Sequence, residues 1–390
     1  MIRQAVILAA GEGQRLQPFT RTKPKVMIEV ANSPILEWVV GALRDVGIRD
    51  IIIVVGYKSE RVLDYFGDGT DFGVEIRYAV QKQQLGTAHA LRQAEDLVLD
   101  EFILLSGDNI IDGETLASVE EPWSLVYKRV DEISKYGAVQ LDDGRVVKIT
   151  EKPAGDDTTH FANTGIYALK REIFDRIGDE TSMVAVLNLL ARDLDLRGVE
   201  SRGLWMDVVY PWDILRVNSQ AIQFSGRTVA GRVEAGTRII GDVKIGANTV
   251  IRGNTYIRGP VIIGKGCEIG PNAVIMPSTS IGDNVMIGSH AYITNSVING
   301  GVRIAPGSFI ERTVISRGCV IGARFTAESG MAEVKVGREY HCVETGIFIG
   351  EDCRIGANVT GMPGTILGNR SSVGSMKEVH GIIPDRSNVL

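Results

Sequence analysis

The residues most able to do chemistry lie near the amino end of the chain. The sequence ILAAGEGQRLQPFTRTKPK, residues 7–25, follows a short apolar run and holds two glycines and then several cations, among them Arg15, Lys23 and Lys25. Glycines let peptide N–H groups come close to a phosphate, because no side chain stands between them. The stretch therefore predicts a phosphate-binding turn.

Glycine-rich turns are of several kinds. A dinucleotide-binding turn needs a third glycine where Leu16 stands, and a P-loop ends in Gly-Lys-Ser/Thr, which is absent. Instead, residues 8–16 read L-A-A-G-x-G-x-R-L, followed by Pro24-Lys25. This signature resembles the sugar-1-phosphate nucleotidylyltransferase family, and the resemblance covers essentially the first half of the chain. Gln14 departs from the threonine or serine that is common at its position.

The resemblance implies a Mg²⁺-dependent reaction in which a hexose-1-phosphate attacks the α-phosphate of UTP or dTTP and releases pyrophosphate. Two like charges about 4 Å apart repel by roughly 4 kcal/mol at an effective dielectric of 20. Each 1.4 kcal/mol or so left uncancelled costs about tenfold in rate. The family pattern places Arg15 on the departing pyrophosphate and Lys25 near the α-phosphate. The nucleotide-binding residues it implies in this turn are Leu8, Ala9, Ala10, Gly11 and Gly13.

Two carboxylates are candidates for the metal. Asp108 in LLSGDN follows a predicted central strand, and Asp207 in LWMDVVYPWDIL resembles the family's W-x-D. Mg²⁺ prefers oxygen ligands, so both are expected to be catalytic and metal-binding. The family usually has glycine or isoleucine-glycine after this aspartate, where Val208-Val209 stand here. Asp213 is expected to cap the following helix.

The resemblance also implies the residues that bind the base and the sugar. In QKQQLGTAHA, Gln81 and the backbone of Gly86 are expected to bind the edge of a pyrimidine, with Thr87 close by and His89 in helix packing. An amide can both donate and accept, which suits uracil or thymine. The expected sugar-phosphate contacts are Gly137, Glu151, Asn163 and Thr164, with Lys152 near the phosphate.

These candidates are positioned by alternating patterns in residues 1–226. QAVILAA, DIIIVVG and EFILLSGD are continuous apolar runs typical of strands that are buried on both faces, and helix-like segments separate the runs. From Trp123 to Leu169 the pattern is β-rich, with a hairpin turn at 142–144. The order predicts an α/β nucleotidylyltransferase domain with a doubly wound, mostly parallel, Rossmann-like sheet.

Residues 227–390 follow a different period. Isoleucine stands at every sixth position from Ile245 to Ile293, and the pattern resumes in a shifted register at Ile298. A coil with three flat sides of six residues stacks each isoleucine on the one a turn above. We therefore predict a left-handed parallel β-helix of hexapeptide repeats. The pattern fails between Ala323 and Gly346, where we expect a protruding loop.

With this coil, the chain is most similar to the archaeal-type two-domain uridylyltransferase/acetyltransferase class. There the coil forms trimers and often N-acetylates an amino-sugar phosphate with acetyl-CoA, using a histidine base. Pro306 stands where that histidine would fall, and neither His290 nor His341 matches it. We expect acetyl transfer to be lost or weak. A bifunctional enzyme and a catalytically inactive regulatory subunit are the alternatives, and retention of Arg15, Lys25 and Asp108 argues against the latter.

Composition limits the partners. The net charge is −6, divided into −10 for the first 226 residues and +4 for the rest, so the catalytic half does not attract nucleic acid by its overall field. No apolar stretch approaches the roughly 18 residues of a membrane span. The chain has only four cysteines, as expected of a protein in the reducing cytoplasm. The expected partners are the two substrates and further copies of the chain, as a homotrimer or a dimer of trimers through the coil.

Overall fold

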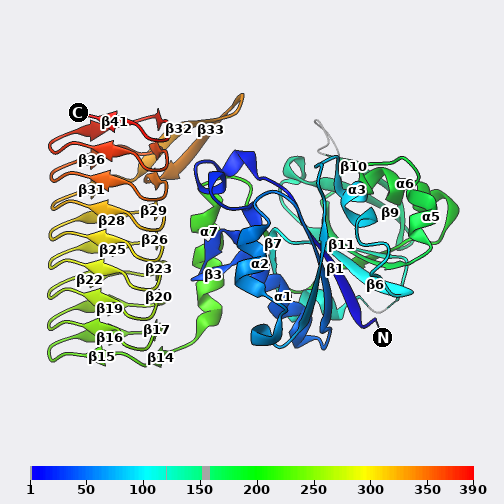
Figure 1. Ribbon diagram of the computed structural model, residues 1–390, viewed down its shortest axis with the longest axis horizontal. Coiled ribbons are helices and arrows are strands. Elements are labelled where there is room, and N and C mark those ends of the chain that lie inside the picture. The colour runs from blue at the N-terminus through cyan, green and yellow to red at the C-terminus, as the bar shows by residue number, and fades with distance from the viewer. Residues whose placement is uncertain (1, 120, 152–158) are drawn as a thin grey trace. The chain divides into compact units, whose positions relative to one another are not determined.

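A computed structural model describes residues 2–119, 121–151 and 159–390 (Figure 1). The chain forms two compact units. The first comprises Met1–Glu12, Lys23–Met27 and Pro34–Asp207, and the second comprises Gly13–Thr22, Ile28–Ser33 and Val208–Leu390. Two short segments from the first 33 residues therefore belong to the same unit as the coil.

The first unit is built on one nine-stranded sheet with the order β5-β4-β1-β6-β11-β8-β12-β10-β9. The neighbours β5, β4, β1 and β6 pair in parallel, whereas β11 runs antiparallel to β6 and β8. The strands are β1 (Gln4–Ala9), β4 (Asp50–Val55), β5 (Glu75–Val80), β6 (Glu101–Ser106), β8 (Ser124–Arg129), β9 (Gly137–Asp142), β10 (Arg145–Glu151), β11 (Phe161–Lys170) and β12 (Arg197–Glu200).

Helices cover both faces of this sheet, as its continuous apolar strands require. Successive side chains of β1 point to opposite faces, so Ile7 packs in the same core as α1 (Ile35–Asp45), while Val6 packs with α3 (Thr87–Arg92) and α6 (Met183–Asp193) on the other face. The helices of this unit are α1 (Ile35–Asp45), α2 (Glu60–Phe66), α3 (Thr87–Arg92), α4 (Gly113–Ala117), α5 (Ile173–Ile177) and α6 (Met183–Asp193). The predicted α/β fold is confirmed.

The hairpin predicted at 142–144 joins β9 and β10. Asp143 and Gly144 both have positive φ values, 44° and 77°, which is the geometry of a tight hairpin turn. A separate two-stranded sheet pairs β7 (Asn109–Ile111) with β13 (Trp205–Asp207). This small sheet brings together two chain segments that are far apart in the sequence, and both of them carry candidate residues.

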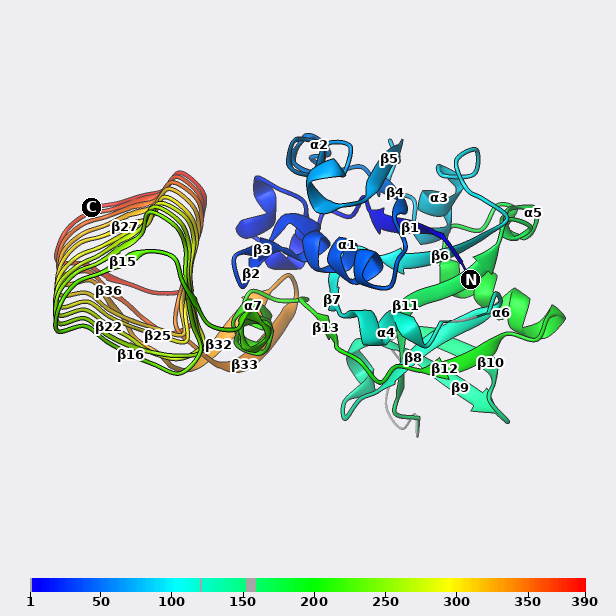
Figure 2. The ribbon, with the colours of Figure 1, turned by 90° about the horizontal axis from the view of Figure 1, so that it is seen from below.

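The coil of the second unit is a β-helix with three parallel sheets of nine, nine and eight short strands. Figure 2 looks along the coil, where successive turns nearly superimpose. One side runs from β14 (Thr228–Val229) to β40 (Ile382–Ile383), the next from β15 (Arg232–Val233) to β41 (Asn388–Val389), and the third from β16 (Arg238–Ile240) to β39 (Glu378–Val379). The predicted hexapeptide coil is confirmed.

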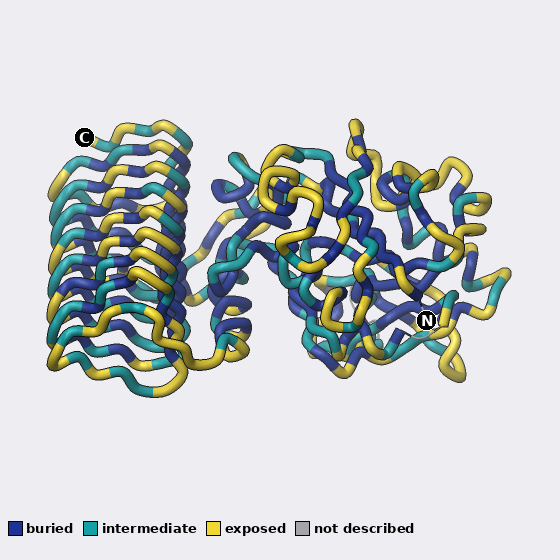
Figure 3. The backbone as a smooth tube through the Cα atoms, turned by 60° about the horizontal axis from the view of Figure 1, so that its bottom comes forward, coloured by how far each residue is buried: buried dark blue, intermediate teal, exposed yellow. Residues whose placement is uncertain are grey.

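The isoleucine period is the stacking period of this coil. Ile245 pairs with Ile263, and Ile263 with Ile281, so a residue meets its own type 18 positions later. The register shift at Ile298 has a simple cause, because that coil is one residue shorter: Ile281 pairs with Ile298. Buried and exposed residues alternate along each turn (Figure 3). Corner asparagines adopt the left-handed conformation, which this residue tolerates better than most: Asn248, Asn254, Asn272 and Asn284.

The expectation of a protruding loop between Ala323 and Gly346 needs correction. The coil continues through β31 (Thr326–Ala327), where alanine replaces the usual isoleucine. An antiparallel hairpin then follows, made of β32 (Gly330–Val336) and β33 (Glu339–Thr345). The hairpin is inserted at a corner, since β29 (Val314–Ile315) pairs directly with β34 (Phe348–Ile349).

Helix α7 (Asp213–Ala221) packs against the coil within the second unit. Asn218 is fully buried, and both ends of its amide group are hydrogen-bonded. Its Oδ1 accepts hydrogen bonds from Ala31 N and Ser280 Oγ, and its Nδ2 donates to the carbonyl of Ser278. A buried amide that is bonded on both ends fixes one packing arrangement, so α7, the segment around Ala31 and the coil form one body.

Candidate active site

A lysine lies between two carboxylates at the carboxyl edge of the first unit's sheet. Lys25 Nζ is 2.6 Å from Asp108 Oδ2 and 3.0 Å from Asp207 Oδ1. Asp108 follows β6 by two residues, and Asp207 ends β13, where it is the register partner of Asn109. The β7–β13 pairing therefore brings the two carboxylates together, although they are about 100 residues apart in the sequence. The carboxyl edge is where α/β sheets commonly place their ligands.

Lys25 and Asp108 hold each other in their charged forms. Burial alone would lower the pKa of Lys25, but the charges of Asp108 and Asp207 outweigh it and hold that pKa above its usual value. Burial would raise the pKa of Asp108, but the charge of Lys25 and hydrogen bonds from Lys25 and Ser106 hold it below its usual value. Lys25 therefore acts as a fixed cation rather than as a proton acceptor.

The two carboxylates suit a divalent cation. Their oxygens already converge on one positive charge, the ammonium of Lys25, and carboxylate oxygens are the donors that hard divalent cations prefer. Among the described residues, no group of three or more His, Cys, Asp or Glu side chains is arranged to hold a metal. A cation here would thus rely on two protein ligands, with its remaining positions left to water or substrate oxygens.

The glycine turn begins where β1 ends. Gly11 is exposed, and a Cβ placed there would meet nothing within 4 Å. Gly13 has a φ of 73°, which favours glycine, and it precedes the short 3₁₀ helix Gln14–Leu16. The carbonyl of Ala10 accepts a hydrogen bond from Gln84 Nε2 at 2.8 Å. Leu8 and Ala9 lie in β1, so the start of the turn is anchored in the sheet and its tip is open.

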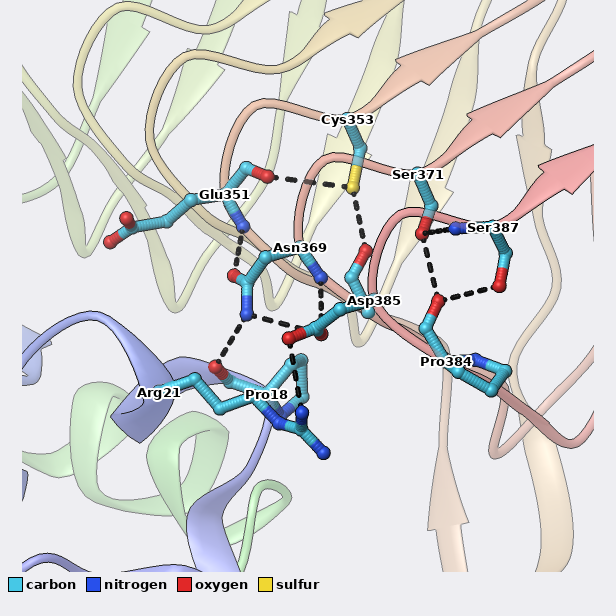
Figure 4. Close-up of polar contacts among 10 residues, drawn as sticks. Pro18, Arg21, Glu351, Cys353, Asn369, Ser371, Pro384, Asp385 and Ser387 are labelled. Atoms are coloured by element: carbon cyan, nitrogen blue, oxygen red, sulfur yellow. Dashed lines mark hydrogen bonds and ion pairs between the residues drawn. The ribbon is translucent and has the colours of Figure 1, made fainter.

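Arg15 belongs to the second unit, where its loop is fastened to the coil. Asn369 Nδ2 donates to the carbonyl of Pro18 at 3.0 Å, and Arg21 forms an ion pair with Asp385 at 3.2 Å (Figure 4). The rings of Phe19 and the buried Phe348 meet edge to face. The loop that carries Arg15 is therefore held by turns near the end of the chain, a connection the sequence did not reveal.

The candidate base-binding loop is held by its own hydrogen bonds. Gln81 is 4% exposed, and its Nε2 donates to the carbonyl of Gly86 at 3.0 Å and lies 3.0 Å from His89 Nδ1. Gly86 has a φ of 136°, and a Cβ there would lie 2.3 Å from the carbonyl oxygen of Thr181. The Thr87 hydroxyl accepts from the peptide N–H of Met183.

His89 thus contacts a candidate base-binding side chain, whereas the sequence suggested helix packing alone. It lies two residues into α3, where its ring reaches back to the loop. The signal available in the sequence was a histidine eight positions after the glutamine, close enough for the two side chains to meet.

The candidate sugar residues lie on three neighbouring strands. Gly137 begins β9 and is the register partner of Glu151 at the end of β10. In β11, Asn163 Nδ2 donates to the Tyr167 hydroxyl at 2.8 Å, and burial raises the pKa of Tyr167. The sheet thus brings three of the expected residues together. Lys152 lies outside the described residues.

Two candidates have internal partners. The Thr164 hydroxyl is buried and donates to the carbonyl of Val126 at 2.6 Å, while the Thr164 carbonyl accepts from Trp205 Nε1 at 3.1 Å. Asp213 begins α7, and its Oδ2 accepts from the peptide N–H groups of Val209 and Tyr210. It therefore shapes the turn that follows Asp207, and it is not the residue that precedes the helix.

Comparison with known proteins decides the family. The model of the nucleotidyl transferase family matches residues 4–223. The chain belongs to the nucleotidyl transferase family. Two further models match the coil of this nucleotidyl transferase: the GMPPB C-terminal domain over residues 257–342, and the hexapeptide repeat of succinyl-transferase over residues 346–375. The resemblance drawn from the glycine turn and the isoleucine period is confirmed.

Relatives of this nucleotidyl transferase share both halves. The Bifunctional protein GlmU of Methanococcus maripaludis (strain C7) is 37% identical, with 95% of this chain and 93% of the relative covered. A bifunctional sugar-1-phosphate nucleotidylyltransferase/acetyltransferase of Sulfurisphaera tokodaii is 34% identical, with 94% of each covered. A solved structure from Bacillus anthracis, described as a glucose-1-phosphate thymidylyltransferase, is 28% identical, covers 57% of this chain and 95% of its own, and has a TM-score of 0.51.

One expected absence concerns membranes. Among the described residues of this nucleotidyl transferase, no helix combines the length and the apolar character that a membrane-spanning helix needs.

Proposed function

We propose that this chain is a sugar-1-phosphate nucleotidylyltransferase that joins UTP or dTTP to glucose-1-phosphate or N-acetylglucosamine-1-phosphate, with release of pyrophosphate. The observation that carries the proposal is the Asp108–Lys25–Asp207 centre beside an open glycine turn. The names of the relatives support the same reaction class.

Each charged group has a part in the reaction. The sugar phosphate is already ionised near neutral pH, because the second pKa of a phosphate ester is about 6, so its oxygen needs no base to attack the α-phosphorus. Lys25, fixed as a cation, offsets the negative charge where the two phosphates meet. Arg15 neutralises the departing pyrophosphate, and the peptide N–H groups of residues 8–13 hold the remaining oxygens.

Mg²⁺ fits between Asp108 and Asp207, which would hold it in exchange for part of the contact to Lys25. When bound, it would supply further positive charge against the phosphate oxygens. Asp108 keeps its charge at neutral pH, because the neighbouring Lys25 holds its pKa below its usual value. These assignments agree with the oxygen-rich donor set on this chain.

The neighbouring loops supply selectivity. We propose that Gln81 and the backbone of Gly86 bind the pyrimidine edge, with His89 orienting the Gln81 amide. Gly137, Glu151 and Asn163 face the sugar from adjacent strands. Thr87 and Thr164 contribute indirectly, since the hydroxyls hold the segments at Met183 and Val126 in place.

Pyrophosphate release tests the proposal. The protein is mixed with Mg²⁺, one of the four common nucleoside triphosphates and one of several sugar-1-phosphates, and released pyrophosphate is measured by a coupled assay. We expect turnover with UTP or dTTP and a hexose-1-phosphate, and little with ATP or GTP, because the Gln81 loop is proposed to bind the edge of a pyrimidine. Absence of turnover with every pair would favour the inactive regulatory subunit instead.

The second activity in the relatives' names, acetyl transfer, is a separate question. We propose that it is lost or weak here, because Pro306 cannot accept the proton that an attacking amine must release. Incubation with acetyl-CoA and glucosamine-1-phosphate is expected to release no more free CoA than a blank. Appreciable CoA release would contradict this and make the chain bifunctional.

We also propose a catalytic domain of residues 1–226 and an assembly domain of residues 227–390, which joins copies into a homotrimer or a dimer of trimers. Exposed apolar side chains on the coil support assembly, among them Met286, Phe309 and Val320. A cytoplasmic location is supported by the four cysteines, all free thiols.

A further inference from the structure

The hairpin inserted in the coil contacts the loop that follows β13. The Tyr210 hydroxyl donates to Glu339 Oε2 at 3.0 Å, and the Tyr210 and His341 ring centroids are 4.4 Å apart. His341 also lies against Trp212, with centroids 5.2 Å apart, and Trp212 stacks on Tyr210 at 4.8 Å. We call Tyr210, Trp212, Glu339 and His341 the aromatic support.

The aromatic support is held on both sides. The peptide N–H of Tyr210 donates to Asp213 Oδ2, which fixes the backbone beneath the ring. On the hairpin, His341 pairs in register with Val334, which is 2% exposed. Gly364 leaves room for this strand, since a Cβ there would lie 2.9 Å from a Val334 methyl group. The hairpin is therefore packed onto the coil, and the position of its His341 is set by that packing.

Arg15 lies near the Tyr210 ring of the aromatic support. Arg15 Cζ lies 6.0 Å from the centroid of the Tyr210 ring, at the limit of a cation–π contact. Burial and the neighbouring Glu339 raise the pKa of Tyr210, and the charge of Arg15 acts in the opposite direction. His341 Nε2 is buried, finds no hydrogen-bond partner among the described residues, and lies 3.4 Å from Glu339 Oε2. Glu339 thus contacts both His341 and the hydroxyl of the ring that Arg15 meets.

A support of this kind matters for Arg15 because of the freedom of its side chain. It is exposed and lies in a 3₁₀ helix of only three residues. A long side chain in that setting has many rotamers, and each must be frozen out when a phosphate binds. A ring face that already holds the guanidinium lowers this cost.

We propose that Tyr210 and the hairpin residue His341 are positioning residues that hold Arg15 ready for the nucleoside triphosphate and the leaving pyrophosphate. The proposal rests on the function proposed above for Arg15. It gives the coil a part in nucleotidyl transfer, because an insertion at one of its corners would hold the Arg15 side chain, in addition to any role of the coil in assembly.

Four variants of the full chain test the proposal. Tyr210→Leu removes the ring face and His341→Ala removes the packing behind it. Tyr210→Phe keeps the ring, and Tyr340→Leu changes an exposed aromatic residue on the opposite face of the same strand. For each variant, KM is measured for the triphosphate, for the sugar-1-phosphate and, in the reverse direction, for pyrophosphate. The melting temperature is measured alongside.

We expect Tyr210→Leu to raise KM for the triphosphate and for pyrophosphate about fivefold, and His341→Ala about threefold, with KM for the sugar-1-phosphate unchanged. Tyr210→Phe and Tyr340→Leu are expected to stay within about twofold of the wild type. Unchanged values for Tyr210→Leu and His341→Ala would overturn the proposal, as would an equal rise in all three KM values together with a lower melting temperature.

An Arg15→Ala variant separates the positioning role of Tyr210 and His341 from the function proposed for Arg15 itself. If Arg15→Ala is strongly impaired while Tyr210→Leu and His341→Ala behave as the wild type, the positioning role fails and the function of Arg15 stands. If Arg15→Ala itself keeps the wild-type KM for triphosphate and pyrophosphate, the function proposed for Arg15 fails, and the positioning role falls with it.

Discussion

Replacement of Asp108 by asparagine is expected to lower kcat about a thousandfold while the protein stays folded. The amide keeps the size of the side chain but removes one of the two charges that hold Lys25 and would hold Mg²⁺. Steady-state pyrophosphate release at saturating substrates measures the effect. A variant within tenfold of the wild type would show that Asp108 is not part of the reacting centre.

Asp50→Asn is the matched control. Asp50 is also an ion-paired aspartate in the same sheet, bonded to Arg77 at 2.7 Å, but it begins β4 at the amino edge rather than lying at the carboxyl edge. We expect Asp50→Asn to keep kcat within about twofold of the wild type, because no reacting group lies at that edge. A similar loss in both variants would point to damage of the sheet and not to chemistry.

The Asp108→Asn variant is also expected to change how the free energy of unfolding depends on pH. Because the pKa of native Asp108 lies below its usual value, its ionised form contributes stability above the unfolded pKa of about 4, and this contribution is lost as the pH falls through the native pKa. The difference in the free energy of unfolding between wild type and Asp108→Asn is therefore expected to be largest near neutral pH and to shrink below about pH 4. Denaturant titrations at several pH values measure it.

Replacement of Arg15 by alanine is expected to lower kcat/KM for the triphosphate by about 10²- to 10³-fold. A guanidinium can form two parallel hydrogen bonds to a phosphate, so in the role proposed for Arg15 its loss would leave the charge of the leaving group uncompensated. Arg15→Lys is expected to recover only part of the loss, because an ammonium group is a point charge without the planar fork. Initial rates at varied triphosphate, and at varied pyrophosphate in the reverse direction, check both variants.

Arg21→Ala is the control for this loop. Arg21 is also an exposed arginine of the segment Gly13–Thr22, but its ion pair with Asp385 faces the coil (Figure 4). Exposed ion pairs contribute little, usually below 1 kcal/mol or so, and we expect kcat/KM within about threefold of the wild type. A deep loss in Arg21→Ala, equal to that in Arg15→Ala, would mean that the loop had been displaced.

The parts of this protein that could be predicted from its sequence are those governed by local repetition. Ile263 meets Ile245 and Ile281 because each coil repeats the last, so a period in the sequence is directly a contact in space. The strand that ends at Ala9 could likewise be predicted, because an unbroken apolar run precedes the glycine turn. The hairpin of β32 and β33 was missed because Ala327 interrupts the isoleucine pattern one strand before the hairpin begins.

Long-range partners could not be predicted in the same way. The resemblance supplied Lys25, Asp108 and Asp207 as separate motifs, but the arrangement of a lysine between two carboxylates depends on the pairing of β7 with β13. The attachment of Pro18 to Asn369 joins residues more than 300 positions apart. No local sequence pattern predicts this contact, because a backbone carbonyl such as that of Pro18 can pair with an amide side chain anywhere in the chain.

The central claim is that Asp108 and Asp207 form a cation site beside the phosphate turn. Crystals soaked with MnCl₂ and dTTP or UTP test it most directly, because Mn²⁺ gives an anomalous signal that locates the ion. We expect one strong peak within coordination distance of both carboxylates, with Lys25 Nζ moved toward the phosphates and the triphosphate along residues 8–15. A nucleotide bound without any peak between Asp108 and Asp207, or a peak on other side chains, would contradict the account.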